Sequence, residues 1–333
     1  MKATGLMRVL AAAAALVGAA SNAQALDQIK IGVGKLSSTA PVLIAQDKGY
    51  FKAENLDASF VFFDAAQTIT MGVSSGSLDF GVTAVSGAFY SLAAAGTIKL
   101  IAGTVRDEPG FQQYAFVISN KAYAAGFTSL KDMAGHSVAI VQIGGPIHYV
   151  LSLLEDKYKI APASVRALPL QAIPNEVSAV AGNTADAGII PATAATPPVT
   201  KGAMKLLGYT GDEVQWQAGG AFASTKMIKD NPKLVERFLR AFRKGLADYH
   251  AAYMGPDDKR KDGPTAPAIT AIIAKYIGQT PQQIESSIPY LDAKGALDPK
   301  DIDHQLDWFR AQGMLKSNIK AADVIEQKYL VTR

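Results

Sequence analysis

The sequence contains no cysteine, and this absence excludes several classes of protein and site. Disulfide frameworks, zinc ribbons, iron–sulfur clusters, cysteine nucleophiles and lipidated cysteine anchors all need the thiol. Charged residues are also few: they make up 19% of the 333 residues, while 49% are hydrophobic. This composition is typical of a globular chain that buries a large core, and the length predicts two lobes or domains.

A positively charged and then apolar segment begins the chain. Lys2 and Arg8 precede an apolar run at 9–20, and Ala23-Gln24-Ala25 then has the pattern of a cleavage site. The apolar run is shorter than the roughly 20 residues that span a bilayer as a helix. We therefore predict a secretory signal peptide over 1–25, cleaved near Ala25, with an uncleaved amphipathic helix as the alternative.

Removal of this segment would lower the formal net charge of the mature chain. The formal charge of +4 falls to +2, because Lys2 and Arg8 leave and no acidic residue leaves with them. The basic cluster at 259–261 is interleaved with aspartates at 257, 258 and 262, so its local field largely cancels. We expect no nucleic-acid partner.

The sequence contains partial matches to catalytic motifs, but the neighbouring residues or predicted elements do not fit them, and it contains no metal-binding motif. Gly34-Lys35 is followed by Leu36, whereas a phosphate-binding P-loop requires Ser or Thr there. The G-x-S-x-G match at 72–76 lies at a predicted helix end, although a nucleophile elbow joins a strand to a helix. The four histidines form no H-E-x-x-H motif. We predict no catalytic residue, cofactor or metal site, and keep an exported hydrolase using Ser74 as the enzymatic alternative.

Strand-like and helix-like segments alternate along the mature chain, which predicts α/β architecture. A first series has strands at 28–33, 58–63, 78–82 and 97–104, with helices at 41–49, 65–75 and 86–95. A second series has strands at 114–118, 137–141, 165–169, 185–189 and 204–209, and a helix at 146–158. From Asn231 onward we predict helices at 232–253, 268–276, 281–287 and 298–312.

Loops that follow the strands are the expected ligand site, because open α/β sheets bind ligands beyond the carboxyl ends of their strands. Gly144-Gly145-Pro146 opens a helix, so free N–H groups at Gly145, Ile147 and His148 could hold an anion. Arg106 follows an apolar strand and is our candidate to pair with a carboxylate or sulfonate, with a surface ion pair to Asp107 or Glu108 as the alternative. Aromatic residues such as Phe63 could wall the site.

Several stretches resemble one transport family. They are PVLIAQDKGYFK at 41–52 with Leu56-Asp57, GSLDFG at 76–81, the helix entry at 144–151, ADAG at 185–188, and QLDWF at 305–309 with Gly313. Together they resemble the nitrate/sulfonate/taurine-type substrate-binding proteins of ABC transporters, within a wider group that includes thiamine-pyrimidine-precursor binding proteins. The resemblance covers essentially the whole mature chain.

The resemblance implies a type II periplasmic-binding fold, with two α/β lobes, two crossing segments near 114–120 and 217–225, and a ligand cleft between the lobes. We predict lobe I at 26–115 and 220–333, and lobe II at 116–219. The predicted ligand-binding residues come from the resemblance and from our own candidates: Ser38, Thr39, Phe63, Ala65, Thr83, Ser86, Arg106, Gly144, Gly145, Pro146, His148 and Pro191. The glycine-glycine-proline entry departs from the commoner Gly-Ser/Thr of that family, which weakens the transfer of a sulfonate-specific contact.

The resulting hypothesis is a monomeric periplasmic solute-binding protein. Its partners would be a small organic anion, a sulfonate or carboxylate, and the membrane permease of an ABC importer. A neutral heteroaromatic ligand, such as a thiamine pyrimidine precursor, is the alternative within the same class. A ligand-sensing module is an alternative of another class.

Overall fold

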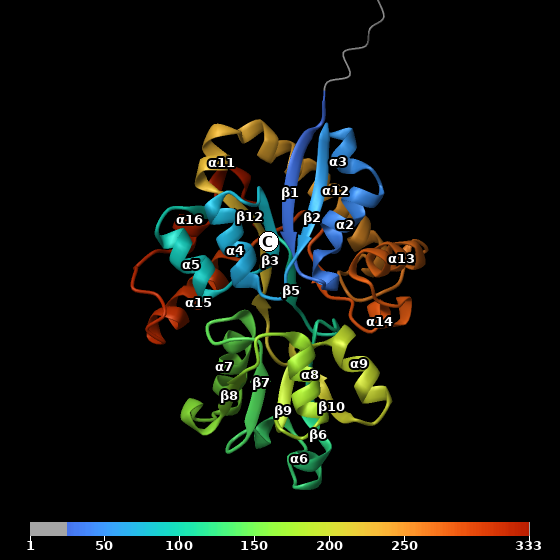
Figure 1. Cartoon of the computed structure of the whole chain (residues 1–333), viewed down its shortest axis with the longest axis vertical. Helices are drawn as coiled ribbons and strands as arrows, with labels where there is room; N and C mark the ends of the chain where they lie inside the picture. Colours follow the sequence, from blue (N-terminus) through green and yellow to red (C-terminus); the bar gives the residue numbers. More distant parts are fainter. Residues whose placement is uncertain (1–24, 333) are drawn as a thin grey trace, which may run out of the picture.

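The structure is a computed structural model that describes residues 25–332, and it has two lobes stacked along its long axis (Figure 1). The predicted signal segment 1–25 therefore lies outside the described residues except for Ala25. Each lobe contains a five-stranded sheet with helices against it, as the alternating sequence pattern predicts. Among residues 25–332, no helix combines the length and apolar character that a membrane span requires.

Lobe I is built on a sheet with strand order β2-β1-β3-β12-β4. Its strands are β1 (Asp27–Val33), β2 (Leu56–Phe62), β3 (Phe80–Ala84), β4 (Ile98–Gly103) and β12 (Gly219–Ser224). Strand β1 runs parallel to β2 and β3, whereas β12 runs antiparallel to β3 and β4. A strand from late in the chain thus completes the sheet of the first lobe.

Lobe II repeats this plan with strand order β10-β6-β9-β7-β8. Its strands are β6 (Tyr114–Ser119), β7 (Ser137–Ile140), β8 (Arg166–Pro169), β9 (Ala187–Pro191) and β10 (Met204–Tyr209). Here β7 runs parallel to β8 and β9, and β6 is the antiparallel strand between β10 and β9. We retain the predicted division at 115/116 and 219/220 as a proposal; these limits fall within β6 and at the start of β12.

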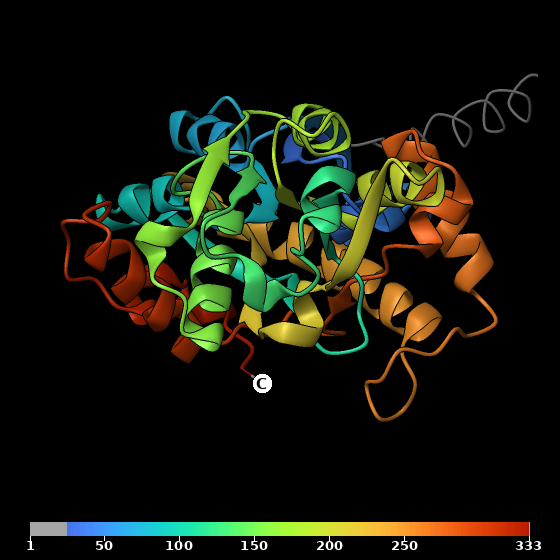
Figure 2. The same ribbon diagram turned by 90° about the horizontal axis from the view of Figure 1, so that it is seen from below.

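The helices follow the predicted pattern closely where proline or apolar spacing marks them. The early helices are α2 (Ala40–Asp47), α3 (Tyr50–Ala53), α4 (Ala66–Ser75), α5 (Gly87–Ala94) and α6 (Asn120–Ala124). Lobe II adds α7 (Pro146–Tyr158), α8 (Ile173–Ala181), α9 (Ala192–Thr200) and α10 (Thr210–Glu213). The later chain forms α11 (Thr225–Asp230), α12 (Pro232–Tyr253), α13 (Ala266–Ile277), α14 (Pro281–Glu285), α15 (Pro299–Ala311) and α16 (Ala321–Val324). Helices α13 and α14 flank one side of the molecule and α15 the other (Figures 1 and 2).

The predicted crossing segments, 114–120 and 217–225, contain β6 and β12, so the connections between the two sheets also include the residues just before these strands. The crossings lie between β5 (Val105–Asp107) and β6, and between β10 and β11 (Trp216–Gln217). Strands β5 and β11 pair antiparallel, and β13 (Tyr290–Leu291) pairs with the other edge of β5. These three strands form a small third sheet, which joins the two crossings and which we call the hinge sheet.

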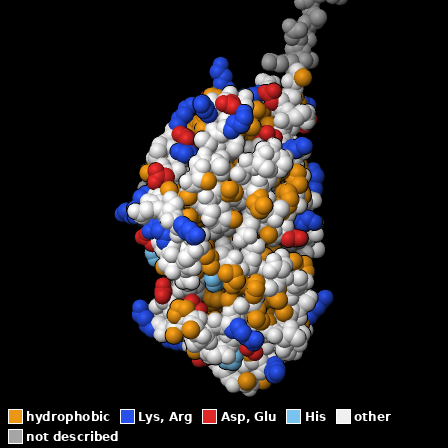
Figure 3. Space-filling model, turned by 60° about the vertical axis from the view of Figure 1, so that its left-hand side comes forward, with side chains coloured by type: hydrophobic (Ala, Val, Ile, Leu, Met, Phe, Trp, Pro, Cys, Tyr) orange, Lys and Arg blue, Asp and Glu red, His pale blue; other side chains and the backbone are white. Residues whose placement is uncertain are grey.

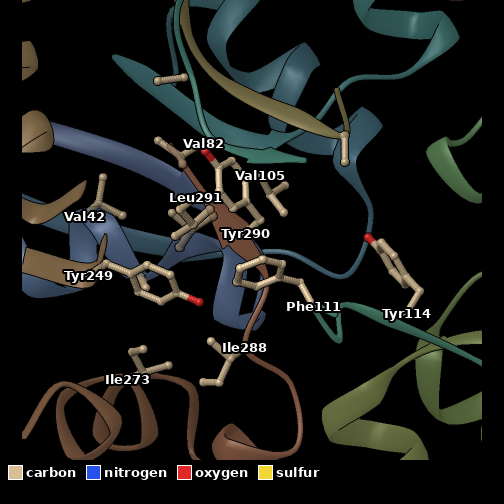
Figure 4. Close-up of a cluster of buried hydrophobic side chains, with 14 of the residues drawn as sticks. Val42, Val82, Val105, Phe111, Tyr114, Tyr249, Ile273, Ile288, Tyr290 and Leu291 are labelled. Atoms are coloured by element: carbon tan, nitrogen blue, oxygen red, sulfur yellow. The ribbon is translucent and has the colours of Figure 1, made fainter. Parts of the chain in front are cut away.

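Aromatic side chains fill the core of lobe I. Phe238 of α12 stacks on Phe80 of β3, with ring centroids 3.9 Å apart, and on Phe51 at 5.9 Å. Beside the hinge, Phe111 packs edge-on against Tyr290, whereas Tyr114 lies apart on the segment that enters lobe II (Figure 4). Phe111 thus anchors the crossing in lobe I, and Tyr114 is left at the boundary between the lobes.

Close packing of α12 on α2 gives a testable consequence at Gly245. A Cβ atom there would lie 2.0 Å from the backbone oxygen of Pro41, which cannot swing away as a side chain can. We expect Gly245→Ala to lower the free energy of unfolding by about 1–3 kcal/mol, despite the better helix propensity of alanine. Urea unfolding followed by circular dichroism measures this change.

Gly72→Ala in α4 is the matched control, because its Cβ would meet chiefly the end of the Leu78 side chain. The loss of stability should be much smaller there. A Gly245→Ala protein as stable as the wild type would contradict this description of the α2–α12 contact.

Candidate ligand-binding site

A cavity of about 90 Å³ lies between the two lobes, and we call it the cleft cavity. Lobe I contributes Gly34, Lys35, Leu36, Phe63, Asp64, Ala65, Ala66, Ile69, Thr83 and Ala84 to its lining. The chain from Tyr114 onward contributes Tyr114, Val141, Gln142, Gly145, Pro146, Ile147, Ile173, Glu176, Ile189 and Pro191. On the face shown in Figure 3, apolar side chains also gather beside the boundary between the lobes.

The position of the cleft cavity follows from the strand directions. In lobe I the lining residues follow β1 and β2 or end β3, and in lobe II they follow β7 or end β9. These are carboxyl ends of strands, where the backbone leaves the sheet and exposes loops to a ligand. The prediction that strand-end loops form a shared site is therefore consistent with the geometry.

The glycine-rich entry of α7 has its own internal hydrogen bonds. Gly144 adopts φ +71°, which favours glycine, and its N–H donates to His148 Nδ1 at 3.2 Å. The Gly145 N–H donates to the Gln142 oxygen, and the His148 N–H to the Gly145 oxygen, both at 3.2 Å. Two of the three N–H groups that we expected to hold an anion therefore already have acceptors within the loop.

The same loop also contacts lobe I directly. The Gly87 N–H at the start of α5 donates to the Gly144 oxygen at 3.0 Å. Tyr149 of α7 lies 2.7 Å from His304 of α15, hydroxyl oxygen to Nδ1, and packs on Trp308 with ring centroids 5.4 Å apart. Through these contacts the two lobes touch directly along this side of the boundary.

Six of the predicted ligand-binding residues line the cleft cavity: Phe63, Ala65, Thr83, Gly145, Pro146 and Pro191. Ser38 lines a smaller adjoining cavity that shares Leu36, Tyr114 and Pro191 with it. The ligand-binding role of these residues remains a prediction, which their common position supports.

Four other predicted residues have different surroundings. Thr39 is buried and donates its hydroxyl to the Leu36 oxygen at 2.7 Å. Ser86 caps α5, its hydroxyl oxygen accepting the Phe89 N–H at 3.3 Å. Gly144 faces Met314 of lobe I, and the ring of His148 packs edge-on against Trp308. None of the four is among the residues that line the cleft cavity in the described chain.

Arg106 also lies away from the cleft cavity, in β5 of the hinge sheet. Its Nε donates to Glu108 at 3.1 Å, and its Nη1 donates to Asp298 at 2.8 Å. The ion pair that we weighed as the alternative is thus present, with Glu108 and with a distant aspartate. Because two carboxylates already occupy this guanidinium, we withdraw Arg106 from the proposed site.

Among the lining residues that sequence reasoning missed, Glu176 is the one that is both acidic and buried. It is fully buried on α8, and neither of its carboxyl oxygens has a hydrogen-bond partner among residues 25–332. Burial raises its pKa to about 8. An acidic residue within the apolar segment IPNEVSAVA was the sequence signal that could have identified it.

The other charged groups of the lining are exposed at the rim. Lys35 and Asp64 both lie in lobe I and reach solvent. Lys35 is the one lysine or arginine among the lining residues that the structure describes. Within residues 25–332 there is also no group of three or more histidine, aspartate or glutamate side chains placed to hold a metal ion.

Comparison with known proteins connects this geometry to a family. A family profile described as NMT1/THI5 like matches residues 37–256, which is more than half of the chain. No curated protein is similar enough in sequence to count as a relative.

Solved structures share the fold at low sequence identity. The alkanesulfonate-binding protein SsuA of Xanthomonas axonopodis pv. citri, bound to MOPS, is 19% identical with a TM-score of 0.70, covering 90% of this chain and 98% of that chain. The periplasmic nitrate-binding protein NrtA of Synechocystis PCC 6803 is 14% identical with a TM-score of 0.67, covering 91% and 86%. The desulfurization enzyme DSZB is 12% identical with a TM-score of 0.62, covering 92% and 97%. The predicted periplasmic-binding fold is thereby confirmed.

The buried carboxyl of Glu176 makes stability depend on pH. Its pKa is about 8 in the folded chain against 4.5 ordinarily, so its favourable contribution is full below pH 4.5 and is lost as the pH rises to about 8. We expect Glu176→Gln to flatten this part of the profile, by up to about 1.4 kcal/mol per pH unit relative to the wild type. Urea unfolding of the ligand-free protein at several pH values measures the difference.

Glu155→Gln is the matched control, because burial raises the pKa of Glu155 only to about 7. In Glu155→Gln, the pH dependence of the free energy of unfolding should be flatter than in the wild type only up to about pH 7. Parallel profiles for the wild type and Glu176→Gln would show that Glu176 is not desolvated as described.

Proposed function

The chain belongs to the NMT1/THI5-like family, and on this premise we propose that it is a periplasmic solute-binding protein of an ABC importer. The observation that carries the proposal is the cleft cavity, which is lined by strand-end loops of both lobes. A ligand that touches both lobes stabilises the closed arrangement by its differential affinity for it. The closed protein would then deliver the ligand to a membrane permease.

The signal-like segment at 1–25 supports export, and the absence of cysteine leaves no lipid anchor of the thioether type. The printed descriptions of SsuA and NrtA as binding proteins point in the same direction. We keep the periplasm as the proposed location and a permease as the proposed partner. A sensing role would use the same closure, with a receptor in place of the permease.

The charge of the lining bears on the class of ligand. The organic-anion hypothesis relied on Arg106, which is paired with Glu108 and Asp298 outside the cleft cavity. The buried charged residue in the lining is Glu176, which would repel an anion when ionised. The lining therefore favours our alternative, a neutral heteroaromatic or another ligand without negative charge.

The size of the cleft cavity limits the ligand as well. A cavity of about 150 Å³ in another protein admits benzene, and the volume here is about 90 Å³. In this closed arrangement the site suits a compact molecule. A ligand with a six-membered ring, such as the heteroaromatic alternative, would require the lobes to stand slightly further apart.

An enzymatic function has less support from the site. Ser74, the nucleophile of the hydrolase alternative, lies near the end of α4 and donates to the Thr97 hydroxyl at 3.3 Å. It is not among the residues that line the cleft cavity in the described chain. The fold itself does not decide the question, since DSZB shares it.

Ligand binding should raise the unfolding temperature. A compound present at 100 times its dissociation constant adds about 2.7 kcal/mol to the free energy of unfolding. We expect a shift with at least one compound in a panel of amino-heteroaromatics, sulfonates, carboxylates and nitrate, measured by scanning fluorimetry. Mass spectrometry of the protein purified without refolding should show the trapped ligand directly, and failure of both measurements would contradict the proposal.

Closure also predicts an effect far from the ligand. Tyr149→Phe keeps the ring but removes the hydrogen bond to His304 across the lobes. We expect ligand affinity to fall about 2- to 10-fold, which corresponds to the roughly 0.5–1.5 kcal/mol of one hydrogen bond. Calorimetric titration with the compound that shifts the unfolding temperature most measures this.

Tyr123→Phe on the exposed side of α6 is the matched control and should leave the affinity unchanged. If Tyr149→Phe also bound like the wild type, the contact between α7 and α15 would not contribute to closure.

A further inference from the structure

Glu176 differs from Asp107 and Asp301, two other enclosed acids near the boundary between the lobes, in having no donor within the described chain. Asp107 accepts the Thr210 hydroxyl at 2.8 Å and the Trp216 indole N–H at 2.9 Å. Asp301 accepts the Gln217 N–H and the Gln305 amide, both at 2.7 Å. For Glu176, both oxygens lack a partner among residues 25–332. The fold therefore supplies donors to Asp107 and Asp301, whereas the described chain supplies none to either oxygen of Glu176.

A buried carboxyl group without a partner is costly. An unpaired polar group removed from water loses several kcal/mol of hydration, and an ionised one loses more. The lining around Glu176 is largely apolar, including Ile173 one turn earlier on α8 and Ile189 on β9. Since Lys35 is exposed at the rim, no buried cation of the lining compensates the carboxyl group. Because Glu176 lines the cleft cavity, a molecule in that cavity is placed to supply the missing partner.

We propose that the ligand presents an amidine-type edge to Glu176, meaning an amino group and a second nitrogen bonded to the same carbon. Such an edge forms two parallel hydrogen bonds with the two oxygens of one carboxyl group, as a guanidinium does. The inference rests on the proposed function, because it assumes that the cleft cavity is the ligand site. It adds the chemical class of the ligand and the residue that selects it.

Either protonation state satisfies this pairing. The protonated carboxyl group donates its O–H to the second nitrogen and accepts one N–H from the amino group. With the proton on the ligand, the carboxylate accepts two N–H groups. In both cases the buried pair carries no net charge, which is the arrangement that a low-dielectric cavity favours.

A carboxylate or sulfonate ligand fits less well. A protonated Glu176 could donate one hydrogen bond to it, but the negative charge of the ligand would remain without a buried cation. Arg106 is held by Glu108 and Asp298, and Lys35 lies at the solvent-facing rim. The structure thus separates the two ligand classes by one residue.

The test compares probes of similar size and different charge. Acetamidine and acetate are planar and nearly isosteric, and 2-aminopyrimidine and methanesulfonate extend the comparison to a ring and a sulfonate. Calorimetric titration of the mature protein should show acetamidine and 2-aminopyrimidine binding at least 10-fold more tightly than either anion. Glu176→Gln should lose at least 10-fold in affinity for acetamidine, because the amide carries no negative charge and its NH2 group cannot accept the second N–H of the cation. Its binding of 2-aminopyrimidine should change little, since the amide donates to the ring nitrogen and accepts the amino N–H as the protonated acid does.

Glu155→Gln is the control, since Glu155 is buried on α7 but does not line the cleft cavity. It should bind all four probes like the wild type. Glu176→Met is a second variant for the case in which Glu176→Gln does not fold. Its apolar side chain has a similar length and leaves no unpaired polar group in the core. It should fold, as judged by circular dichroism, and should also lose binding of the nitrogen compounds.

Proton release gives an independent readout for acetamidine. Burial places the pKa of Glu176 at about 8, so binding of the cation at pH 7 should expel a proton from the wild type and none from Glu176→Gln. The other titratable groups of the lining are Tyr114 on β6 and the exposed Lys35 and Asp64. Titrations in buffers of different ionisation heat count the released protons.

The outcomes separate the two proposals. Tighter binding of acetate or methanesulfonate, unchanged binding of acetamidine in Glu176→Gln, or a trapped ligand without nitrogen would overturn the amidine inference and leave solute binding in place. If no probe bound and mass spectrometry found no trapped molecule, the proposed function itself would fail.

Discussion

The two lobes depend on the antiparallel pair of β5 and β11, where the chain crosses from one sheet to the other and back. Asp107 in β5 holds this pair together, since one carboxyl oxygen accepts both the Thr210 hydroxyl and the Trp216 indole N–H. Burial raises the pKa of Asp107 to about 6, and the two donors oppose that rise. A single buried group thus ties both crossing segments at the point about which the lobes would move.

The orientation of the two sheets about this hinge creates the site. Each sheet directs carboxyl ends of its strands toward the other lobe, so loops distant in sequence meet at the cleft cavity. The contacts between α7 and α15, through Tyr149 and His304, hold the same boundary from one side. On the other side, Thr196 of α9 donates to Ser286 beside α14 at 2.9 Å. A ligand bound as proposed would therefore act on an equilibrium that the lobes already influence by their own contacts.

Electrostatics, more than fold, distinguishes what the cleft cavity can bind. The same fold is found in an alkanesulfonate-binding protein, a nitrate-binding protein and a desulfurization enzyme. In this chain a buried acid without a partner lines the cleft, and the arginine expected there serves the hinge instead. Specificity is accordingly a property of a few side chains on a common scaffold.

Local signals in the sequence determined the order of strands and helices and the loops that form the site. Proline at a first helical turn marked α7 and α12 correctly, because proline suits that position and apolar residues then recur at the helical period. Six predicted residues reach the cleft cavity because they follow strands. Only the tertiary structure decided the surroundings of Arg106 and Glu176. Arg106 pairs with Asp298, 192 residues away, and Glu176 is enclosed by elements of both series. Such pairings depend on how the sheets and helices pack, and no periodicity along the chain encodes them.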